Sequence, residues 1–543
     1  MPMAPKRMTR EVAKNLTIAE QHEWFQQQRS RRAILKGGLA TGSVLGGAAL
    51  LGPSAGASVL RARRPTTTPS PYLISSVTPS NASGVVPFGR HIAYGADPSR
   101  HMNMAWQVAS PVGNPFVRLG DSPFNLGEQI PAALKVVSTP YADITSFLDS
   151  VPPAASTAKA PEEQYYAHVS ADFLEPGTTY YYVVGHQGLD PRSSGLAQAP
   201  IASFTTAPSR PTPFTFTAFG DQGVTYDAVG TTNLILAQSP AFHLHAGDIS
   251  YAEDGGDGLL TDDYDPRLWD QFFSQSASTA AFIPWMASLG NHEMEPWYSP
   301  NGYGADVNRF DFPGNGPSVC PGTYFFAYGN VGFISLDPND VSYEIPANLG
   351  YSGGAQTTWL GQTLQGFRDN PQIDFIVVFF HHCAYCTCST HGSEGGVRQF
   401  WTPLFDQFSV DLVINGHNHI YERTDPLIAG AVTTAAPIGS TIEPATQGTT
   451  YVTCGSAGKS LYAFGAPDSY EDNVDTVASV ASFINESGGT ETKETVPWSR
   501  VRYTGYALVV AEVNPSAFGP STMLVRILNE ESTEIDRFTL ARP

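Results

Sequence analysis

The hydrophobic positions of residues 81–207 form short runs, and turn residues separate each run from the next. Apolar runs of this length between turn residues are typical of β-strands. We expect strands over 102–108, 132–137, 165–169, 180–184 and 201–205. His, Cys and carboxylate residues do not gather at ligand spacings in this region, so we interpret it as an all-β structural or positioning domain.

From residue 212 onward the pattern changes to apolar strands that alternate with amphipathic helices. Prolines at positions 208, 211 and 213 mark the boundary. We expect strands over 214–219, 241–246, 283–289, 375–380 and 410–415, helices over 228–238, 266–281, 355–367 and 397–408, and final strands over 450–454 and 506–513. This alternation predicts a multidomain protein in which residues 212–543 form an α/β domain with ligand residues at the carboxyl ends of its strands.

Each of the five strands expected between residues 214 and 415 ends in residues that ligate metal ions in proteins. These residues are Asp221, then Asp248 with Tyr251, then Asn291 with His292 and Glu293, then His381, and finally His417 with His419. Turns favour a single Gly-Asp pair on their own, but five such strand ends together indicate one site. Carboxylate, phenolate, amide and imidazole donors suit iron, zinc and manganese. A bridging carboxylate would hold two cations about 3.5–4 Å apart, so the pattern predicts a two-metal phosphoesterase.

The sequence around these residues resembles the motifs of the purple acid phosphatases, within the broader metallophosphoesterase family. The motifs read Gly220-Asp221-x-Gly223, Gly247-Asp248-Ile-Ser-Tyr251, Gly290-Asn291-His292-Glu293, Val378-Phe-Phe-His381 and Gly416-His417-Asn-His419-Ile-Tyr421-Glu422-Arg423. The tyrosine three residues after the second aspartate separates this family from other metallophosphoesterases. The resemblance covers about residues 80–543. It implies a fibronectin type III-like domain over 81–207 and a catalytic domain built as a mixed β-sandwich flanked by helices.

The first of these two domains carries one local sign of that resemblance. The segment 174–182, which ends in three tyrosines, resembles the corner of a fibronectin type III sandwich. In such a corner a tyrosine hydroxyl bonds back to the chain and fixes the bend. We expect Trp106 to be the core tryptophan of the sandwich.

The resemblance also implies a role for each residue at the strand ends. Asp221, Tyr251 and His419 would hold a ferric ion, Asp248 would bridge to the second metal, and Asn291, His381 and His417 would complete the second site. Iron, zinc or manganese occupies that second site in the family. His292 would contact the phosphate, and Glu293 is suited to orient its ring. His391 fits the position of a histidine that acts on the leaving group, with Thr390 where some relatives carry a second histidine.

These residues predict an enzyme, an acid phosphatase that hydrolyses phosphate monoesters. A metal-bound hydroxide would attack phosphorus at a dinuclear Fe(III)–M(II) centre, and the partner would be a small phosphate ester. Two alternatives stay open. One is a phosphodiesterase or nucleotide pyrophosphatase of the same superfamily, and the other is a surface binding protein that carries metal but is catalytically idle.

Residues 1–57 predict an export signal of the twin-arginine type. Ser30-Arg31-Arg32-Ala33-Ile34-Leu35-Lys36 precedes a Gly/Ala/Leu stretch, and Ala55-Gly56-Ala57 offers a cleavage site. The stretch of about 15 residues is shorter than the roughly 20 that span a bilayer, which argues against the alternative of a membrane anchor. Residues 58–80, rich in Pro, Thr, Ser and Arg, would be a linker. We expect a secreted or cell-envelope protein, exported by the twin-arginine machinery, without a stable membrane partner after cleavage.

The charge of the chain limits its partners. The formal net charge is −20, which argues against nucleic acid and anionic membranes as partners. The loop 252–265 contains six carboxylates. It would be either a solvated insertion or a rim that repels highly charged substrates.

The five cysteines leave two interpretations open. They are Cys320, Cys383, Cys386, Cys388 and Cys454. The three that lie close together resemble a metal knuckle, but one or two disulfides with one thiol left over are an equal alternative after export. We expect a disulfide to order the loop that leads to His391, with the pairing left open.

Overall fold

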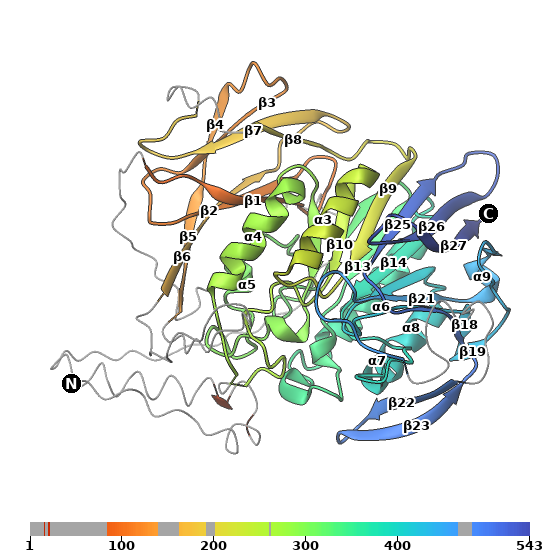
Figure 1. The fold of residues 1–543 in the computed structure, drawn as a ribbon. Coiled ribbons are helices and arrows are strands. Elements are labelled where there is room, and N and C mark those ends of the chain that lie inside the picture. The colour runs from red at the N-terminus through yellow and green to blue at the C-terminus, as the bar shows by residue number, and fades with distance from the viewer. Residues whose placement is uncertain are drawn as a thin grey trace, which may run out of the picture.

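The computed structural model describes residues 84–139, 162–191, 201–259, 262–464 and 480–543, together with Leu16, Glu20 and Gln21. Apart from those three residues, the predicted signal peptide and linker lie outside the described residues. Within the described ranges, none of the helices has both the length and the apolar character that crossing a membrane requires. The chain forms a β-rich N-terminal domain and a larger α/β domain, as predicted (Figure 1).

The N-terminal domain consists of two four-stranded antiparallel sheets. One has the order β1 (Phe88–Tyr94), β2 (Met102–Val108), β6 (Glu162–Ala171) and β5 (Ala133–Thr139), and the other has the order β4 (Glu128–Pro131), β3 (Phe116–Gly120), β7 (Thr179–Gly185) and β8 (Ala202–Thr205). All five strands expected here are present, and β2 begins and ends where the sequence predicts. Trp106 on β2 is fully buried in the core.

A tyrosine corner lies at the start of β7. The hydroxyl of Tyr180 accepts a hydrogen bond from the backbone N–H of Glu175 at 2.9 Å. This is the back-bonding that the segment 174–182 predicts. The chain turns between them at Gly177, whose φ of 62° costs a glycine no steric strain. The corner agrees with the fibronectin type III resemblance, which itself stays a prediction.

The α/β domain contains two seven-stranded sheets. The first has the order β11 (Trp285–Ser288), β10 (Phe242–Ala246), β9 (Phe214–Phe219), β25 (Ala507–Asn514), β26 (Ser521–Asn529), β27 (Glu534–Arg542) and β20 (Thr441–Ile442). The second has the order β12 (Tyr324–Tyr328), β13 (Val331–Ser335), β14 (Phe375–Phe380), β16 (Leu412–Asn415), β21 (Thr450–Cys454), β17 (Tyr421–Thr424) and β24 (Ser499–Tyr503). The C-terminal strands complete both sheets, because β25 pairs with β9 and β24 pairs with β17.

Each sheet has a parallel part, and the two parts face each other. Strands β9, β10 and β11 run parallel in the first sheet, as do β13, β14, β16 and β21 in the second. Aromatic rings fill the space between them: the ring centroid of Phe333 on β13 lies 5.1 Å from those of Phe216 on β9 and Phe242 on β10. The carboxyl ends of β9, β10 and β16 meet where Gly220 and Gly416 lie against the carbonyl of Ala246.

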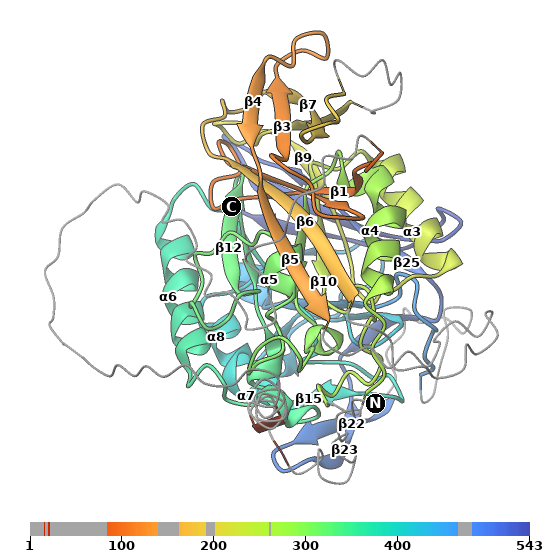
Figure 2. The same cartoon turned by 90° about the vertical axis from the view of Figure 1, so that its left-hand side faces the viewer.

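Helices flank the two sheets. They are α3 (Tyr226–Gln238), α4 (Arg267–Ala280), α5 (Asp306–Arg309), α6 (Ala355–Asp369), α7 (Gly395–Phe400), α8 (Thr402–Gln407) and α9 (Pro444–Gln447). Figure 2 shows α3 and α4 on one side of the sheets and α6 and α8 on the other. The single helix expected over 397–408 is wrong, since the chain breaks at Trp401 into α7 and α8. Pro403 lacks an N–H and is tolerated in the first turn of a new helix rather than in the interior of a longer one.

The remaining elements are short. They are the sheet of β15 (Ser393–Glu394), β22 (Val480–Glu486) and β23 (Thr490–Val496), the pair β18 (Leu427–Ile428) and β19 (Ala431–Val432), and the 3-10 turns η1 (Asn291–Glu293), η2 (Pro338–Asp340) and η3 (Pro346–Asn348). The turns η1 and η2 and the strands β15 and β22 supply loops around the site described below.

The N-terminal domain packs against α4 and the loop after α5, and we call this contact the domain interface. The ring of His91 on β1 stacks on that of Phe273 on α4, with centroids 4.3 Å apart. Lys135 on β5 and His168 on β6 both bond to the carboxylate of Asp311, at 3.1 and 2.6 Å. The interface therefore combines ring stacking with partly buried polar contacts.

Candidate metal centre

Four residues at the strand ends adopt a left-handed backbone conformation. Asp221 follows β9, Asp248 and Tyr251 follow β10, and His417 follows β16, with φ values of 62°, 53°, 56° and 68°. This conformation costs a residue with a Cβ roughly 1–2 kcal/mol. Strain of this kind collects at functional sites. All four side chains are buried, so the backbone itself marks the strand ends as the candidate site.

Two glycines let these strand ends approach one another. A Cβ added at Gly290 would lie 2.1 Å from Oδ1 of Asp248, and one added at Gly416 would lie 2.5 Å from Oδ2 of Asp221. Contacts that short are impossible, so any larger residue would push the carboxylates apart. The glycines before Asn291 and His417 are therefore required by packing as well as by the turn.

The three residues expected to hold the ferric ion converge. The hydroxyl of Tyr251 lies 3.1 Å from Oδ1 of Asp221 and 2.9 Å from Nε2 of His419. Nε2 of His419 is also 3.3 Å from the same Asp221 oxygen. On the far side of its ring, Nδ1 of His419 donates to the carbonyl of Ser460 at 2.7 Å. That bond leaves the lone pair of Nε2 facing the other two donors.

The residues expected at the second metal lie beside this group. Nε2 of His381 is 3.1 Å from Oδ2 of Asp248 and 3.3 Å from Nδ1 of His417. Asp221, Asp248 and His381 each offer a ligand atom within 4.8 Å of the others. Asn291 donates its Nδ2 to the carbonyl of Gly256 at 2.8 Å. Its Oδ1 is buried and has no hydrogen-bond partner among the described residues.

The pKa shifts at the centre indicate that its buried carboxylates favour a positive charge beside them. Burial would lower the pKa of His381, but the carboxylates of Asp248 and Asp221 outweigh it and raise the pKa to about 10. Burial would raise the pKa of Asp248, but the charges of His381 and His292 hold it well below the usual range. For Tyr251, burial and the same carboxylates raise the pKa well above 10. A phenolate at Tyr251 therefore needs a cation beside it.

This donor set fits two transition-metal cations. The inner atoms are carboxylate, phenol and amide oxygens and imidazole nitrogens, which suit iron, zinc and manganese. The outer atoms of His381 and His419 are held by the backbone carbonyls of Ala246 and Ser460. Such outer bonds fix the tautomer and the orientation of metal-binding imidazoles. Contacts thus link six of the seven residues expected as ligands, and the seventh, Asn291, has its Oδ1 buried and unpaired among the described residues. Together they would form the dinuclear centre that the resemblance implies.

His292 lies at the edge of this group. Its Nδ1 donates to the carbonyl of Glu253 at 2.7 Å, and its Nε2 lies 3.7 Å from Oδ2 of Asp248. Its ring centroid is 4.3 Å from that of Tyr251. The ring therefore turns Nε2 toward the metal group.

Glu293 does not orient His292 as we expected. Its two carboxylate oxygens accept the backbone N–H groups of Asp248, Ile249 and Gly290, at 2.9, 2.8 and 2.7 Å. The 3-10 turn η1 directs the side chain back toward β10, away from the ring of the preceding residue. Glu293 thus stabilises the turn that carries Asp248 rather than the imidazole beside it.

The described residues of the acidic loop, 252–259 and 262–265, are folded against the site, which contradicts the interpretation of the loop as a solvated insertion. Glu253 is buried and accepts the backbone N–H groups of Gly255 and Gly256 at 2.9 and 2.8 Å. Burial, with Asp262 beside it, raises the pKa of Glu253 well above its usual range. The carbonyls of Glu253 and Gly256 in turn bond to His292 and Asn291. The loop is therefore a wall of the site.

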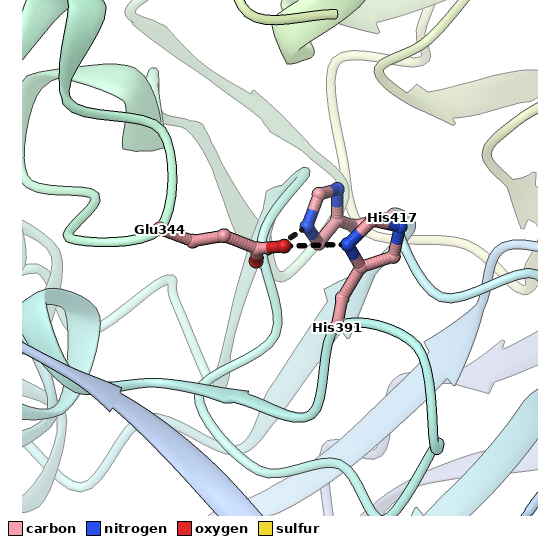
Figure 3. Close-up of side chains that lie close together, drawn as sticks. All are labelled: Glu344, His391 and His417. Carbon is pink, nitrogen blue, oxygen red and sulfur yellow. Dashed lines mark hydrogen bonds and ion pairs between the residues drawn. The ribbon is translucent and has the colours of Figure 1, made fainter. Parts of the chain in front are cut away.

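His391 lies next to His417, with ring centroids 4.2 Å apart. Figure 3 shows Glu344 pointing at both rings. Its Oε1 is 2.5 Å from Nδ1 of His391, and its Oε2 is 3.1 Å from Nε2 of His417. Sequence reasoning missed Glu344, because it stands in the loop between η2 and η3 without a motif around it.

The segment after β21 forms another wall that sequence reasoning missed. The ring of Tyr462 stacks on that of His419 with centroids 4.0 Å apart, and its hydroxyl lies 3.3 Å from Nε2 of His391. Nζ of Lys459 lies 4.0 Å from the ring centroid of Tyr251. Burial lowers the pKa of Lys459. These residues follow the expected strand 450–454, but no ligand motif marks them, and the fold brings them to the site.

The expected disulfide is not formed, since all five cysteines are unpaired and buried. Cys383 donates its thiol to the carbonyl of Gly416 at 3.0 Å. Cys383, Cys386 and Cys388 pack with Ile420 and Phe464 in one small apolar cluster. The loop that leads to His391 is thus ordered by burial of the thiols and not by a covalent bond.

Comparison with known proteins agrees with this geometry. Residues 87–206 match the family model for the purple acid phosphatase N-terminal domain, and residues 214–421 match that for calcineurin-like phosphoesterases. An uncharacterized protein of Mycobacterium tuberculosis is 32% identical over 500 residues, which cover 85% of this chain and 88% of that protein. Purple acid phosphatase 23 of Arabidopsis thaliana is 28% identical over 295 residues, 51% of this chain and 61% of that protein.

A solved structure has the same fold. The purple acid phosphatase from yellow lupin (Lupinus luteus) seeds superposes with a TM-score of 0.60 at 19% identity, covering 84% of this chain and 75% of that chain. The two family models match consecutive parts of the sequence, in the order in which the structure forms its two domains. The chain belongs to the purple acid phosphatase family, within the calcineurin-like phosphoesterases.

Proposed function

We propose that this protein is an exported acid phosphatase that hydrolyses phosphate monoesters at a centre of one ferric ion and one divalent iron, zinc or manganese ion. The observation that carries the proposal is the convergence of six donor side chains at the strand ends, with the Oδ1 of Asn291, unpartnered among the described residues, expected to supply a seventh donor. The seven residues are Asp221, Asp248, Tyr251, Asn291, His381, His417 and His419. When bound, the two cations would lower the pKa of water and neutralise the charge that develops on the phosphoryl group.

The surrounding residues would bind the ester and handle its protons. Nε2 of His292 faces the metal group and would donate to a phosphoryl oxygen. The ammonium of Lys459, beside Tyr251, would add positive charge on the same side. Nε2 of His391 would deliver a proton to the oxygen of the departing alcohol. His391 and His292 thus have separate tasks, one on the leaving group and one on the phosphoryl group.

The activity is tested with purified protein loaded with iron and zinc. We expect hydrolysis of 4-nitrophenyl phosphate that a strong chelator abolishes and that added metal restores. A parallel assay with bis(4-nitrophenyl) phosphate distinguishes a phosphodiesterase, for which the diester would be the faster substrate. No turnover of either ester by protein that holds both metals would leave the catalytically idle binding protein as the better account.

Colour tests the ferric site separately from turnover. A phenolate on ferric iron absorbs visible light, so the oxidised protein should be pink to violet. Tyr251→Phe should remove the visible band, while Tyr324→Phe should keep it, because Tyr324 is buried on β12 and bonds to the carbonyl of Ala287. A band that survives in Tyr251→Phe would place the phenolate elsewhere.

Export is the remaining part of the proposal, and it rests on the twin-arginine pattern around Arg31 and Arg32. Changing both arginines to lysine keeps the charge but removes the pattern. We expect the variant to stay inside the cell, while the parent protein reaches the cell envelope or the medium. Equal distribution of the two proteins after cell fractionation would contradict this route.

A further inference from the structure

We infer that Glu344 is a positioning residue, whose carboxylate holds the rings of His391 and His417 in fixed orientations so that Nε2 of His391 faces the leaving group. This inference rests on the proposed function, because it assigns Glu344 a part in the same reaction. It extends the site to a residue that none of the motifs contains. Figure 3 shows the arrangement on which it depends.

The two contacts of Glu344 define the tautomers of both rings. An ionised carboxylate only accepts hydrogen bonds, so each imidazole must present an N–H to it. The contact at Nδ1 of His391 therefore leaves Nε2 to face the hydroxyl of Tyr462 and the site. The contact at Nε2 of His417 leaves Nδ1 to face His381 and the metal group. A carboxylate behind a metal-binding histidine is a common way to fix its orientation.

The loop that carries Glu344 is held by a second, buried carboxylate. Glu394 accepts the backbone N–H of Tyr343 at 2.8 Å and that of Glu344 at 3.1 Å. It also accepts the hydroxyl of Ser342 at 3.1 Å. Because Glu394 is almost fully buried, these bonds compete little with water. The backbone of Glu344 is thus fixed independently of the contacts that its side chain makes with the two rings.

A third segment completes the arrangement. Asn485 on β22 donates its Nδ2 to Oε2 of Glu344 at 3.2 Å and to the carbonyl of His391 at 2.8 Å. The amide therefore ties the carboxylate to the backbone of the residue that it orients. Side chains held by several bonds from different segments keep a catalytic group within the narrow tolerance that proton transfer requires.

The shape of the carboxylate is essential to this role. The side chains of Glu344 and His391 are each about one fifth to one quarter exposed, at 21% and 24%, whereas His417 is buried at 3%. Glutamine has the same size but offers one acceptor oxygen and one amide donor. In Glu344→Gln, one of the two ring N–H groups must therefore face another donor. The more exposed ring, His391, is the one that is free to turn away.

The leaving group provides the test. 4-Nitrophenolate departs without a proton, whereas the alkoxide of glycerol 2-phosphate needs one. We expect Glu344→Gln to lower kcat for glycerol 2-phosphate at least about 10-fold and kcat for 4-nitrophenyl phosphate less than about 3-fold, with KM little changed. Metal content and the visible band should match those of the parent protein. Glu486→Gln is the matched control, because Glu486 is exposed at the end of β22, next to Asn485. Among the described residues its carboxylate accepts a hydrogen bond only from the hydroxyl of Thr492.

A double variant shows whether Glu344 acts through His391. Once His391→Gln has removed the ring, adding Glu344→Gln should cause no further loss with glycerol 2-phosphate. Equal losses with both esters, additive losses in the double variant, or unchanged rates would each overturn the inference. Loss of a metal ion in Glu344→Gln would also overturn it, and would favour direct metal binding by Glu344, His391 and His417, whose ligand atoms lie within 4.8 Å of one another.

The inference and the proposed function can fail separately. If the parent protein with both metals hydrolyses neither ester, the proposed function is wrong. Crystal structures of the parent protein and of Glu344→Gln then decide the positioning role alone. A rotated His391 ring in the variant supports it, and an unchanged ring contradicts it.

Discussion

The metal centre and the domain interface both bury histidines and carboxylates, but they satisfy them in opposite ways. At the interface, Nδ1 and Nε2 of His168 both face acceptors, namely Asp311 at 2.6 Å and the carbonyl of Asn308 at 2.8 Å. At the centre, Nε2 of His381 and Nδ1 of His417 face each other at 3.3 Å. Two imidazole nitrogens at that distance need a proton or a cation between them. The polar groups of the interface bond to one another and join the two domains, whereas those of the centre are arranged to bind a cation.

The two regions also differ in how their buried carboxylates are neutralised. Arg309, at the end of α5, borders the interface, because its carbonyl lies 3.0 Å from Nε2 of His91. Its side chain bonds to Glu295 at 2.9 Å and to Asp306 at 3.2 Å, and all three side chains are fully buried. The chain thus provides the cation that these carboxylates need. Asp221 and Asp248 instead rely on His381, whose pKa they raise to about 10. A buried charge without a partner is costly, so the centre gains most from an added cation.

The largest effect is expected from Asp248, the carboxylate proposed to bridge the two metals. Asp248→Ala should lose both metal ions and lower kcat by at least about a thousand-fold, since both cations and their electrostatic stabilisation depend on it. Asn291→Ala, which would remove a proposed ligand of one metal only, should lower kcat by about 10- to 100-fold. In the metal-free protein each change removes only local contacts, of Asp248 with His292 and His381 or of Asn291 with Gly256, so the thermal stability should fall less than in an Arg309→Met variant. Metal analysis, kinetics and thermal unfolding give the three readouts.

The outcome bears directly on the comparison. A metal-free Asp248→Ala protein that unfolds at a much lower temperature than the metal-free parent would show that the centre also holds the fold. An Asp248→Ala protein that retains both metals would remove Asp248 from its bridging role. Either result would weaken the distinction between a centre that binds metal and an interface that stabilises the fold.

The next effect concerns the interface, and its pattern should be the reverse. Arg309→Met leaves Glu295 and Asp306 buried without their cation, which costs about 3–5 kcal/mol of unfolding free energy. Metal content and kcat should stay close to those of the parent protein. Arg537→Met is the control, because Arg537 is 58% exposed and lies 3.8 Å from Glu534. An exposed pair of this kind contributes at most about 1 kcal/mol. Equal denaturant midpoints for the two variants would contradict the role assigned to Arg309.

The two regions also differ in how far the sequence reveals them. The strands of the centre were predictable because each is a continuous apolar run, and β9 and β14 begin and end where the pattern predicts. The ligand residues follow those runs directly, so their convergence follows from the parallel arrangement. The short strands β12 and β13 were missed, since Gly329 and Asn330 join them in a hairpin within one aromatic stretch.

What the sequence did not reveal depends on contacts between distant segments. Glu344 meets Asn485 across 141 positions, and His391 meets Tyr462 across 71. No local pattern of hydrophobic or polar residues encodes such pairs. The same holds for the interface, where His168 and Asp311 are 143 positions apart. Residues that ligate metals follow a strand end, whereas residues that orient them can come from anywhere in the chain.

The smallest effect is a dependence of stability on pH that originates at the interface. Burial lowers the pKa of His91 to about 4, although the carbonyls of Gly89 and Arg309 lie 2.9 and 3.0 Å from its ring nitrogens. The ring is therefore neutral in the folded protein at pH 6, whereas in the unfolded chain it binds a proton below its usual pKa of about 6.5. Its contribution to stability is complete above pH 6.5 and is lost as the pH falls toward 4.

The size and the test of this effect follow from the same pKa. The shift corresponds to at most about 3 kcal/mol across that range. His91→Gln can still donate to one of the two carbonyls but does not titrate, so its unfolding free energy should fall less steeply between pH 6.5 and 4 than that of the parent protein. Denaturant titrations of both proteins in the same metal-loaded state remove any contribution of the centre from the difference. Parallel curves would mean that acid acts on the fold elsewhere, and a steeper curve for the variant would reverse the assignment. If the unfolding free energy of the variant depends less on pH, part of the loss of stability in acid originates at the domain interface, away from the metal centre.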